Sequence, residues 1–345
     1  MIGIAVVGYG YWGPNLVRNI TETTGARLAC VCDLDTKRLA QAQSRYPAIN
    51  TTSDYSEVLS DPAVHAVAIA TPVSSHFKLA MQALMAGKHV LVEKPMAASR
   101  DEAARMVEEA ARRRLVLAVD HTFVHTGAVQ KMSELVESGL GDMYYYDSVR
   151  VNLGLFQHDV SVIWDLAVHD LSILDYILPE KPVAVSATGM SHLRGEPENI
   201  AYLTLFFDSK LIAHIHVNWL APVKVRRTLI GGSNKMIVYD DLEPSEKIKV
   251  YDKGITMDDK ADAYGETVRQ MLVGYRSGDM YAPRLDVTEA LKRELEQFVQ
   301  CIETGSHPIT DGHAGLRVVN TLEAATRSLA QRGRVIELEE ARRIA

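Results

Sequence analysis

The stretch IAVVGYGYWG at residues 4–13 decides the fold of this chain. Residues 4–7 are uninterruptedly apolar, as expected of a strand that is covered on both faces of a parallel sheet. Three glycines follow at the spacing G-x-G-x-x-G, directly after that strand and at the start of a predicted helix. In this context the glycines allow a tight turn and a close approach of the backbone to a pyrophosphate, which the helix N-terminus favours. The stretch therefore predicts a dinucleotide-binding loop.

An acidic residue supports this prediction. Asp33 ends the second predicted strand, 20 residues after Gly13, where a carboxylate would accept hydrogen bonds from the ribose hydroxyls of the adenosine. The same carboxylate would repel a 2′-phosphate, so the sequence favours NAD over NADP. Lys37 and Arg38 lie close enough to weaken this preference, and we interpret them as solvated charges at the start of a helix.

Strands and helices alternate through the first 120 residues. Further buried strands are predicted at residues 28–32, 66–70, 90–92 and 115–119. One helix is expected at residues 74–86, and another, at 99–114, opens with a capping box of Ser99 and Glu102. Repeated strand–helix units in this order predict a parallel, doubly wound sheet.

The rhythm changes after Asp120. A helix near 127–138 and a strand near 144–153 precede a helix with an apolar stripe between residues 163 and 178. Strands then dominate from 183 to 251, which predicts an open, mainly antiparallel sheet in an α+β domain; residues 252–285 are polar and expected to be irregular. Two amphipathic helices close the chain. The expected division is a Rossmann domain at 1–121, a substrate-binding and oligomerisation domain at 122–311, and a helix and tail at 312–345 that return to the Rossmann domain.

Composition excludes several classes of function. The formal net charge of -7 comes without a basic stripe, which argues against nucleic acid as a partner. No apolar run approaches the roughly 18 residues of a membrane span, and the start of the chain lacks a basic leader, so a cytoplasmic protein is expected. Cys30, Cys32 and Cys301 lack a second couplet for a thiolate metal site, so no metal is predicted.

Two groups of residues are candidates for chemistry. Glu93-Lys94-Pro95 follows the fifth predicted strand, at the edge where open α/β sheets bind ligands. Asp165 and His169 are i and i+4 on one predicted helix and therefore share a face. Taken singly, a lysine at the end of a strand and a polar helix face also fit solvent exposure.

Together these residues resemble the Gfo/Idh/MocA family, named after glucose–fructose oxidoreductase, inositol dehydrogenase and a rhizopine catabolism protein. The resemblance is carried by the glycine loop, Asp33, Ala70-Thr71-Pro72 with His76, Glu93-Lys94-Pro95, Asp165-x3-His169 and a helix beginning near Gly312. It implies an NAD-dependent dehydrogenase with Lys94, Asp165 and His169 as its catalytic residues. The positions that it implies for cofactor binding are Gly8, Gly10, Tyr11, Trp12, Gly13, Asp33, Thr71, Pro72, His76, Glu93 and Lys94.

A narrower resemblance concerns the substrate. The stretch RVNLGLFQ at residues 150–157, running on to WDL at 164–166, is similar to a branch that acts on nucleotide-linked amino sugars or their uronic acids. That branch oxidises a ring hydroxyl, typically at C3, to a ketone. The tract HTFVHT at 121–126 departs from the arginine- or tyrosine-bearing segment of many relatives, so we assign it no substrate role.

Three alternatives remain open from the sequence. An inositol or free-sugar dehydrogenase would share the same catalytic trio, and an NAD-dependent glycosidase would begin with the same oxidation. A non-catalytic NAD-binding regulatory protein would be expected to lose the lysine or the histidine, and both are present.

Roles within the trio also remain open. His169 is the first choice as base because histidine titrates near neutrality, with Lys94 polarising the oxygen and Asp165 holding either residue in place. A lysine depressed by burial beside the nicotinamide charge would be the alternative base.

Residues 211–219 carry a prediction about assembly. Ala213, Ile215, Val217 and Trp219 alternate with His214, His216 and Asn218, so the two sets point to opposite faces of a strand. The apolar set suits the core of the domain. Too few helices remain to cover the mixed set, and relatives associate through this sheet, so a homodimer or homotetramer joined by this face is expected. A metal site on the histidines is the weaker interpretation, since no third ligand is indicated.

Overall fold

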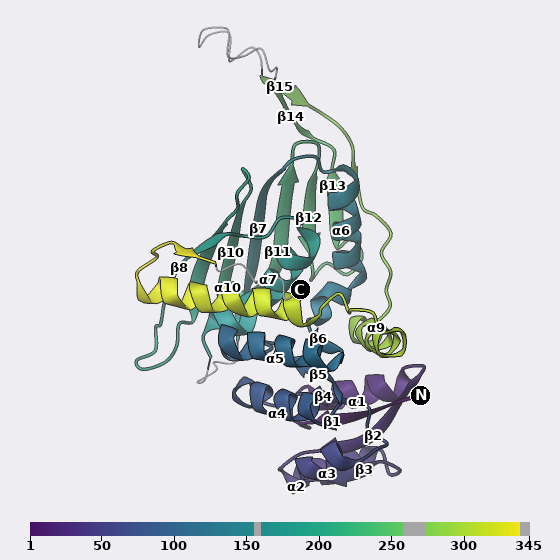
Figure 1. The fold of residues 1–345 in the computed structure, drawn as a ribbon. Coiled ribbons are helices and arrows are strands. Elements are labelled where there is room, and N and C mark those ends of the chain that lie inside the picture. Colours follow the sequence, from purple (N-terminus) through teal and green to yellow (C-terminus); the bar gives the residue numbers. More distant parts are fainter. Residues whose placement is uncertain (155–159, 258–272, 339–345) are drawn as a thin grey trace.

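The first layer of the molecule is a six-stranded sheet (Figure 1). The computed structural model describes residues 1–154, 160–257 and 273–338. All neighbouring strands pair in parallel, in the order β3-β2-β1-β4-β5-β6. The strands are β1 (Ile2–Val7), β2 (Ala26–Cys32), β3 (Asn50–Thr52), β4 (Ala66–Ile69), β5 (His89–Glu93) and β6 (Leu117–Asp120). The strand order reverses between β1 and β4, and such a reversal opens a crevice at the carboxyl ends of the strands.

Helices cover both faces of this sheet, which confirms the doubly wound prediction. One face packs against α1 (Gly13–Glu22), α2 (Thr36–Arg45) and α9 (Ala290–Thr304). The other face packs against α3 (Tyr55–Ser60), α4 (Val73–Met85), α5 (Arg100–Arg113) and α10 (Gly312–Ala330). The predicted capping box starts α5: the Ser99 hydroxyl accepts from the backbone N–H of Glu102 at 3.3 Å, and the Glu102 carboxylate accepts from Ala98.

The second layer is a nine-stranded sheet in the order β16-β13-β12-β11-β7-β10-β9-β8-β17. Its pairs are antiparallel except that of β10 with β7, so the predicted mainly antiparallel sheet is confirmed. Its strands are β7 (Met143–Leu153), β8 (Ala184–Met190), β9 (Ile200–Phe206), β10 (Ile212–Asn218), β11 (Leu220–Gly232), β12 (Met236–Asp240), β13 (Ile248–Tyr251), β16 (Met280–Tyr281) and β17 (Ile336–Glu337).

One face of this sheet carries the core of the second layer. It packs against α6 (Gly127–Gly139), α7 (Val168–Ile177) and part of α10. On β10 and just beyond it, the alternation of side chains follows the sequence: the buried residues are Ala213, Ile215, Val217 and Trp219. The intervening residues face away from the helices, where His216 stacks on the exposed ring of Tyr202 at 4.4 Å and His214 lies 3.3 Å from Asp147.

The end of the chain follows the expected division only in part: α10 packs on the six-stranded sheet as expected, whereas α9 and the last strand lie elsewhere than expected. The apolar stripe of α9, including Leu295 and Phe298, is buried in the core of the first sheet, so this helix belongs with the Rossmann layer. Helix α10 lies between the two layers, against α5 and β8 (Figure 1). The strand that follows it, β17, pairs with β8 and does not return to the six-stranded sheet, because its apolar Ile336 packs on the core of the second layer.

The segment expected to be irregular contains a two-stranded sheet. β14 (Gly254–Met257) pairs antiparallel with β15 (Val273–Arg276), and the pair projects beyond the nine-stranded sheet (Figure 1). Its base is held by Arg276, which bonds to the Asp252 side chain and to the Asn234 carbonyl. The polar composition of residues 252–285 concealed these strands, which pair only with each other.

Other expectations concern the cysteines, metals and membranes. The three cysteines are buried and unpaired, and burial raises the pKa of the Cys30 thiol to about 11, so it stays protonated. Among residues 1–154, 160–257 and 273–338, no three histidine, cysteine or acidic side chains gather as a metal ion would require. None of the helices in those ranges is both long and apolar enough to cross a membrane.

Candidate active site

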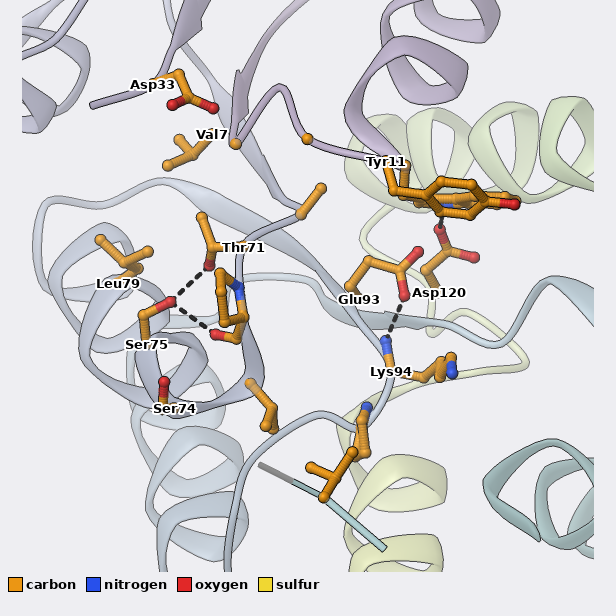
Figure 2. A pocket seen from close by; sticks show the side chains of 18 of the residues that line it. Val7, Tyr11, Asp33, Thr71, Ser74, Ser75, Leu79, Glu93, Lys94 and Asp120 are labelled. Atoms are coloured by element: carbon orange, nitrogen blue, oxygen red, sulfur yellow. Dashed lines mark hydrogen bonds between the residues drawn. The ribbon is translucent and has the colours of Figure 1, made fainter. Parts of the chain in front are cut away.

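A cavity of about 1670 Å³ lies at the carboxyl edge of the six-stranded sheet and reaches the facing side of the second layer. Its walls combine loops after β1, β2, β4, β5 and β6 with residues from the second layer. We call the part near Asp33 the nucleotide end and the part near Lys94 the sugar end, after the ligands that the family resemblance implies for them; Figure 2 shows these two residues apart on its walls. Site residues that line it include Gly8, Gly10, Tyr11, Trp12, Asp33, Thr71, Pro72, Glu93, Lys94, Asp165 and His169.

Two glycines of the first loop have no room for a side chain. Gly8 has a φ of +96°, and a Cβ there would lie 2.5 Å from the Ala70 carbonyl oxygen. A Cβ on Gly13 would lie 2.2 Å from the carbonyl oxygen of Gly8. Gly8 borders the cavity, whereas Gly13 lies behind the loop and allows α1 to pack against it. Glycine is therefore required for the turn at the first position and for close packing at the second.

The N-terminus of α1 is suited to an anion. No side chain caps this helix, and its first turn contains no acidic residue. Pro14 has no N–H and the Asn15 N–H donates to the Trp12 carbonyl at 2.9 Å, so the attraction for an anion comes from the helix dipole, which favours negative charge at this end. Gly10 and Tyr11, whose side chain is 95% exposed, line the cavity beside this end. These features fit the pyrophosphate of a dinucleotide.

Asp33 is fixed by backbone N–H groups. One carboxylate oxygen accepts from Tyr9 at 2.6 Å and the other from Asp35 at 2.8 Å. Arg38 lies 3.7 Å from the same carboxylate and also lines the cavity, whereas Lys37 does not. The Arg38 side chain is half exposed, as expected of a solvated charge, and it also stands at the nucleotide end beside Asp33.

The loop after β4 is held by hydrogen bonds. The Thr71 and Ser75 hydroxyls lie 2.7 Å apart, and Ser75 also donates to the Pro72 carbonyl (Figure 2). His76, only 1% exposed, does not line the cavity. Its two ring nitrogens lie 2.9 Å from the Pro95 carbonyl and 2.8 Å from the Thr71 carbonyl. The expected cofactor contact is corrected to a positioning role: burial places His76 behind the loops that carry Thr71 and Lys94.

Lys94 and Asp165 meet across the cavity. The ammonium of Lys94, directly after β5, lies 3.3 Å from one carboxylate oxygen of Asp165 and 3.1 Å from its backbone carbonyl. The other carboxylate oxygen accepts from the Trp219 indole at 3.1 Å. The structure thus brings together two residues that the sequence placed 71 positions apart.

The helix that carries Asp165 is not the single α-helix expected. Its first turn, η2 (Ile163–Ala167), is π-helical, and α7 begins at Val168. Turns of this kind widen a helix locally and are frequent at functional sites. Asp165 and His169 nevertheless both face the cavity.

His169 is neutral at neutral pH. Its ring packs edge-on against Phe123, with the ring centroids 5.0 Å apart. Burial, followed by the positive charges of Lys94 and Arg150, lowers the pKa of His169 well below its ordinary value. An uncharged imidazole beside the Lys94–Asp165 pair is available to accept a proton.

Asp120 is a site residue that the sequence did not identify. It ends β6, pairs in register with Glu93, lines the cavity and accepts from the Trp12 indole at 2.6 Å. Burial and the neighbouring Asp120 raise the pKa of Glu93 well above its ordinary value, which favours its protonated form. Figure 2 shows both carboxyl groups beside Lys94. A signal was available, since both residues end neighbouring parallel strands.

Further ionisable groups lie behind Asp120. Glu294 of α9 is 2% exposed, and neither of its carboxyl oxygens has a hydrogen-bond partner among the described residues. Burial and the charge of Asp120 raise the pKa of Glu294 well above its ordinary value. Burial lowers the pKa of His121 and of His125 to about 4. Burial therefore disfavours the charged form of each of these three groups.

The wall of the sugar end also contains residues for which the sequence analysis predicted no contact with substrate. The segment at 121–126 was assigned no substrate role, yet Thr122, Phe123 and Thr126 line the cavity. The reason is that η1 (Thr122–His125) turns at the carboxyl end of β6, toward the site. Of the stretch at 150–157, residues 155–157 lie outside the described residues. Asn152, Gly154, Trp219 and Arg226 also line the cavity.

Comparison with known proteins identifies the family. The profile of the GFO_IDH_MocA oxidoreductase family with an NAD-binding Rossmann fold matches residues 2–121. The profile of the family's C-terminal alpha/beta domain matches residues 134–338. The chain belongs to the Gfo/Idh/MocA oxidoreductase family. It is accordingly an oxidoreductase with an NAD-binding Rossmann domain, as the sequence predicted.

Relatives within the Gfo/Idh/MocA family act on sugars and polyols. The chain is 28% identical to UDP-N-acetylglucosamine 3-dehydrogenase of Acidithiobacillus ferrooxidans, over 91% of this chain and 93% of that one. It is 25% identical to the NAD-dependent scyllo-inositol 2-dehydrogenase of Bacillus subtilis, over 90% and 87%. The solved structure of the Acidithiobacillus enzyme, GnnA, superposes with a TM-score of 0.79, 25% identity and coverage of 96% and 99%.

Proposed function

We propose that this Gfo/Idh/MocA protein is an NAD-dependent dehydrogenase that oxidises a ring hydroxyl, at C3, of a nucleotide-linked amino sugar or its uronic acid to a ketone. The observation that carries the proposal is the contact of Lys94 with Asp165, beside a neutral His169, in a cavity that continues to a glycine loop and Asp33. The resemblance to UDP-N-acetylglucosamine 3-dehydrogenase supports the substrate class.

The nucleotide end fits the cofactor. Gly8, Gly10 and the uncapped N-terminus of α1 would hold the pyrophosphate, and Asp33 would accept from the ribose hydroxyls. We propose NAD over NADP because Asp33 repels a 2′-phosphate, with Arg38 opposing that effect. When bound, the nicotinamide supplies the acceptor for the hydride. The cavity of about 1670 Å³ exceeds the roughly 300–1,000 Å³ of ordinary ligand pockets, so it has room for a sugar nucleotide as well.

The sugar end supplies the proton chemistry. Neutral His169 would accept the proton of the reacting hydroxyl, while the Lys94 ammonium donates to its oxygen and stabilises the developing negative charge. Asp165 positions Lys94 through the 3.3 Å contact and is itself held by Trp219. We favour His169 as the base over Lys94 because the ring is uncharged and the ammonium is paired with a carboxylate.

An inositol dehydrogenase is the second candidate, since the scyllo-inositol enzyme is nearly as similar over nearly as much of the chain. It would need the same trio and a smaller substrate pocket. A regulatory role without turnover is less favoured, because Lys94, Asp165 and His169 are all present and line one cavity.

The test is a screen of NAD reduction, followed by absorbance of the reduced cofactor, over nucleotide sugars, free sugars and inositols. We expect the highest kcat/KM with a UDP-linked amino sugar or its uronic acid. Turnover of inositols alone would select the second candidate. Cofactor binding without turnover of any compound would favour a regulatory protein.

We also propose that the chain forms a homodimer or homotetramer through the open face of the nine-stranded sheet. The support is that this face carries exposed Tyr202 and Met190 and half-buried His216, and exposed apolar sheet faces are typical of subunit contacts. Light scattering should give a mass of two or four chains of 38.2 kDa, and Tyr202→Glu should lower it. A wild-type monomer at micromolar concentration would contradict the proposal.

A further inference from the structure

Two arginines lie side by side over one aromatic ring at the sugar end. Arg226 of β11 is the register partner of Arg150 on β7. The guanidinium of Arg150 lies 4.6 Å from the centroid of the Phe123 ring, and that of Arg226 lies 5.5 Å from it. The same ring contacts His169. A pair of permanent cations therefore stands one aromatic ring away from the proposed base.

The two arginines differ in how fully their charge is neutralised, although one buried donor of each, Nη1 of Arg150 and Nε of Arg226, has no partner among the described residues. Arg150 is 3% exposed and donates from Nε and Nη2 to the two carboxylate oxygens of Asp170, at 2.6 and 3.3 Å. This arginine is neutralised by a partner of its own and does not line the cavity. Its role is to support the wall.

Arg226 retains unused donors. It makes one bond of 3.2 Å from Nη1 to Asp241, and its buried Nε has no partner among the described residues. Its side chain is 28% exposed and lines the cavity. Asp241 is shared with Lys247, which lies 3.2 Å from the same carboxylate. One carboxylate therefore serves two cations, and the guanidinium that faces the cavity is only partly neutralised.

The position of this guanidinium indicates what it would bind. A planar guanidinium matches a carboxylate through paired hydrogen bonds better than any other side chain does. Phe123 contacts both Arg226 and His169, so a group bound by Arg226 would belong to the reacting sugar ring or lie next to it. The positive end of α1, which suits a phosphate, lies at the other end of the cavity.

We propose that Arg226 binds a carboxylate on the sugar ring of the substrate, so that the protein prefers a nucleotide-linked uronic acid to the corresponding neutral amino sugar. This inference rests on the proposed function and deepens it. The diphosphate of the nucleotide is the other anion that the substrate offers, and a matched pair of substrates separates the two, because both carry the diphosphate and only one carries the carboxylate.

The experiment measures kcat/KM at saturating NAD for UDP-N-acetylglucosaminuronic acid and for UDP-N-acetylglucosamine. We expect the wild type to prefer the acid by about tenfold or more, and Arg226→Gln to lower kcat/KM for the acid by about 100-fold, as for a lost charge-assisted pair. The neutral sugar should change by no more than about threefold. Arg226→Lys, which keeps the charge without the paired donors, should fall in between.

A matched control is Arg227→Gln, which removes the same charge from the exposed neighbour on the same strand; it should leave both substrates unchanged. NAD affinity and the unfolding temperature of each variant show whether the fold is intact. An equal loss for both substrates in a folded Arg226→Gln variant would assign the arginine to the diphosphate and overturn the inference.

Kinetics of the wild type alone distinguish a failure of the inference about Arg226 from a failure of the proposed function. Turnover of the neutral sugar as efficiently as the acid would overturn the role of Arg226 and leave the proposed function standing. Turnover of neither sugar would contradict the proposed function, and the inference with it.

Discussion

The nucleotide end and the sugar end of the cavity are built by different means. The nucleotide end uses backbone: the turn at Gly8, the positive end of the α1 dipole and a carboxylate, Asp33, fixed by two N–H groups. The sugar end uses side chains from distant parts of the chain, such as the contact of Lys94 with Asp165. Truncating one side chain at the sugar end should therefore abolish turnover. At the nucleotide end, NAD affinity should fall only when an atom is added to the backbone turn or a charge is changed.

The largest effect is expected from the sugar end. Lys94→Ala and His169→Ala should each lower kcat by about 100-fold or more, the scale of a lost general base or charge-stabilising donor. NAD affinity should stay within about twofold, because the cofactor contacts are mostly backbone. Steady-state kinetics and cofactor titration check both values. Near-normal turnover in either variant would show that the residue has no role in the mechanism. A loss of NAD affinity as large as the loss of kcat would show that the two ends are not built differently.

Gly8→Ala tests the nucleotide end by adding a single methyl group. The φ of +96° and the 2.5 Å approach to Ala70 leave no room for it, so the loop must shift. We expect the Kd for NAD, measured by calorimetry, to rise by about tenfold or more. Gly87→Ala is the control, because its φ is also positive, at +76°, but nothing lies within 4 Å of the added Cβ. Equal effects of the two substitutions on NAD affinity would show that the loop is not a close-packed cradle.

The carboxylate of the nucleotide end should set cofactor preference. Asp33→Ser is expected to shift the ratio of NAD to NADP affinity toward NADP by about tenfold, the scale of one charged contact. Arg38→Ala should shift it the other way, since Arg38 is the cation beside Asp33. Both ratios follow from titration with the two cofactors. A wild type that already binds NADP as tightly would mean that Arg38 dominates.

The same contrast explains what could be predicted from the sequence. The loop of Gly8, Gly10 and Gly13 follows its strand within a few residues, so its role could be inferred from local context, and the doubly wound sheet followed from strand–helix alternation. Lys94 and Asp165 were identified by resemblance to a family, and the sequence left open whether Asp165 would hold Lys94 or His169; its carboxylate contacts Lys94.

Residues whose role depends on long-range packing were missed. Arg226 and Phe123 meet only because β11 pairs beside β7 and η1 turns under them. Nothing in the sequence near His76 shows that its ring bridges two carbonyls. The π-helical turn at Asp165 was hidden for the same reason, since the apolar stripe of the helix continues through it.

The smallest predicted effect concerns Glu294, whose carboxyl group is buried behind Asp120. The pKa of Glu294 is higher in the folded state than its ordinary value of 4.5. Above pH 4.5 the folded state therefore binds more protons than the unfolded state. As the pH rises further, this carboxyl group lowers the free energy of unfolding. Glu294→Gln removes that cost. We expect the unfolding temperature to rise by about 2 °C at pH 8 and to change little at pH 4.

Buried histidines act in the opposite direction. Their folded pKa of about 4 lies below the ordinary 6.5, so stability is present above pH 6.5 and is lost as the pH falls toward 4. Scanning calorimetry of wild type and Glu294→Gln from pH 4 to pH 8 separates the two contributions. A variant that is less stable than wild type at pH 8 would show that the carboxyl group is ionised and paired.

The most direct test of the central claim follows the hydride itself. A UDP-linked amino sugar or uronic acid deuterated at C3 is incubated with the protein and NAD, and the cofactor is analysed by mass spectrometry. We expect one deuterium in the reduced cofactor, a ketone at C3 of the sugar, and loss of both in Lys94→Ala. Reduced cofactor without deuterium, or label that transfers only from another carbon, would contradict it.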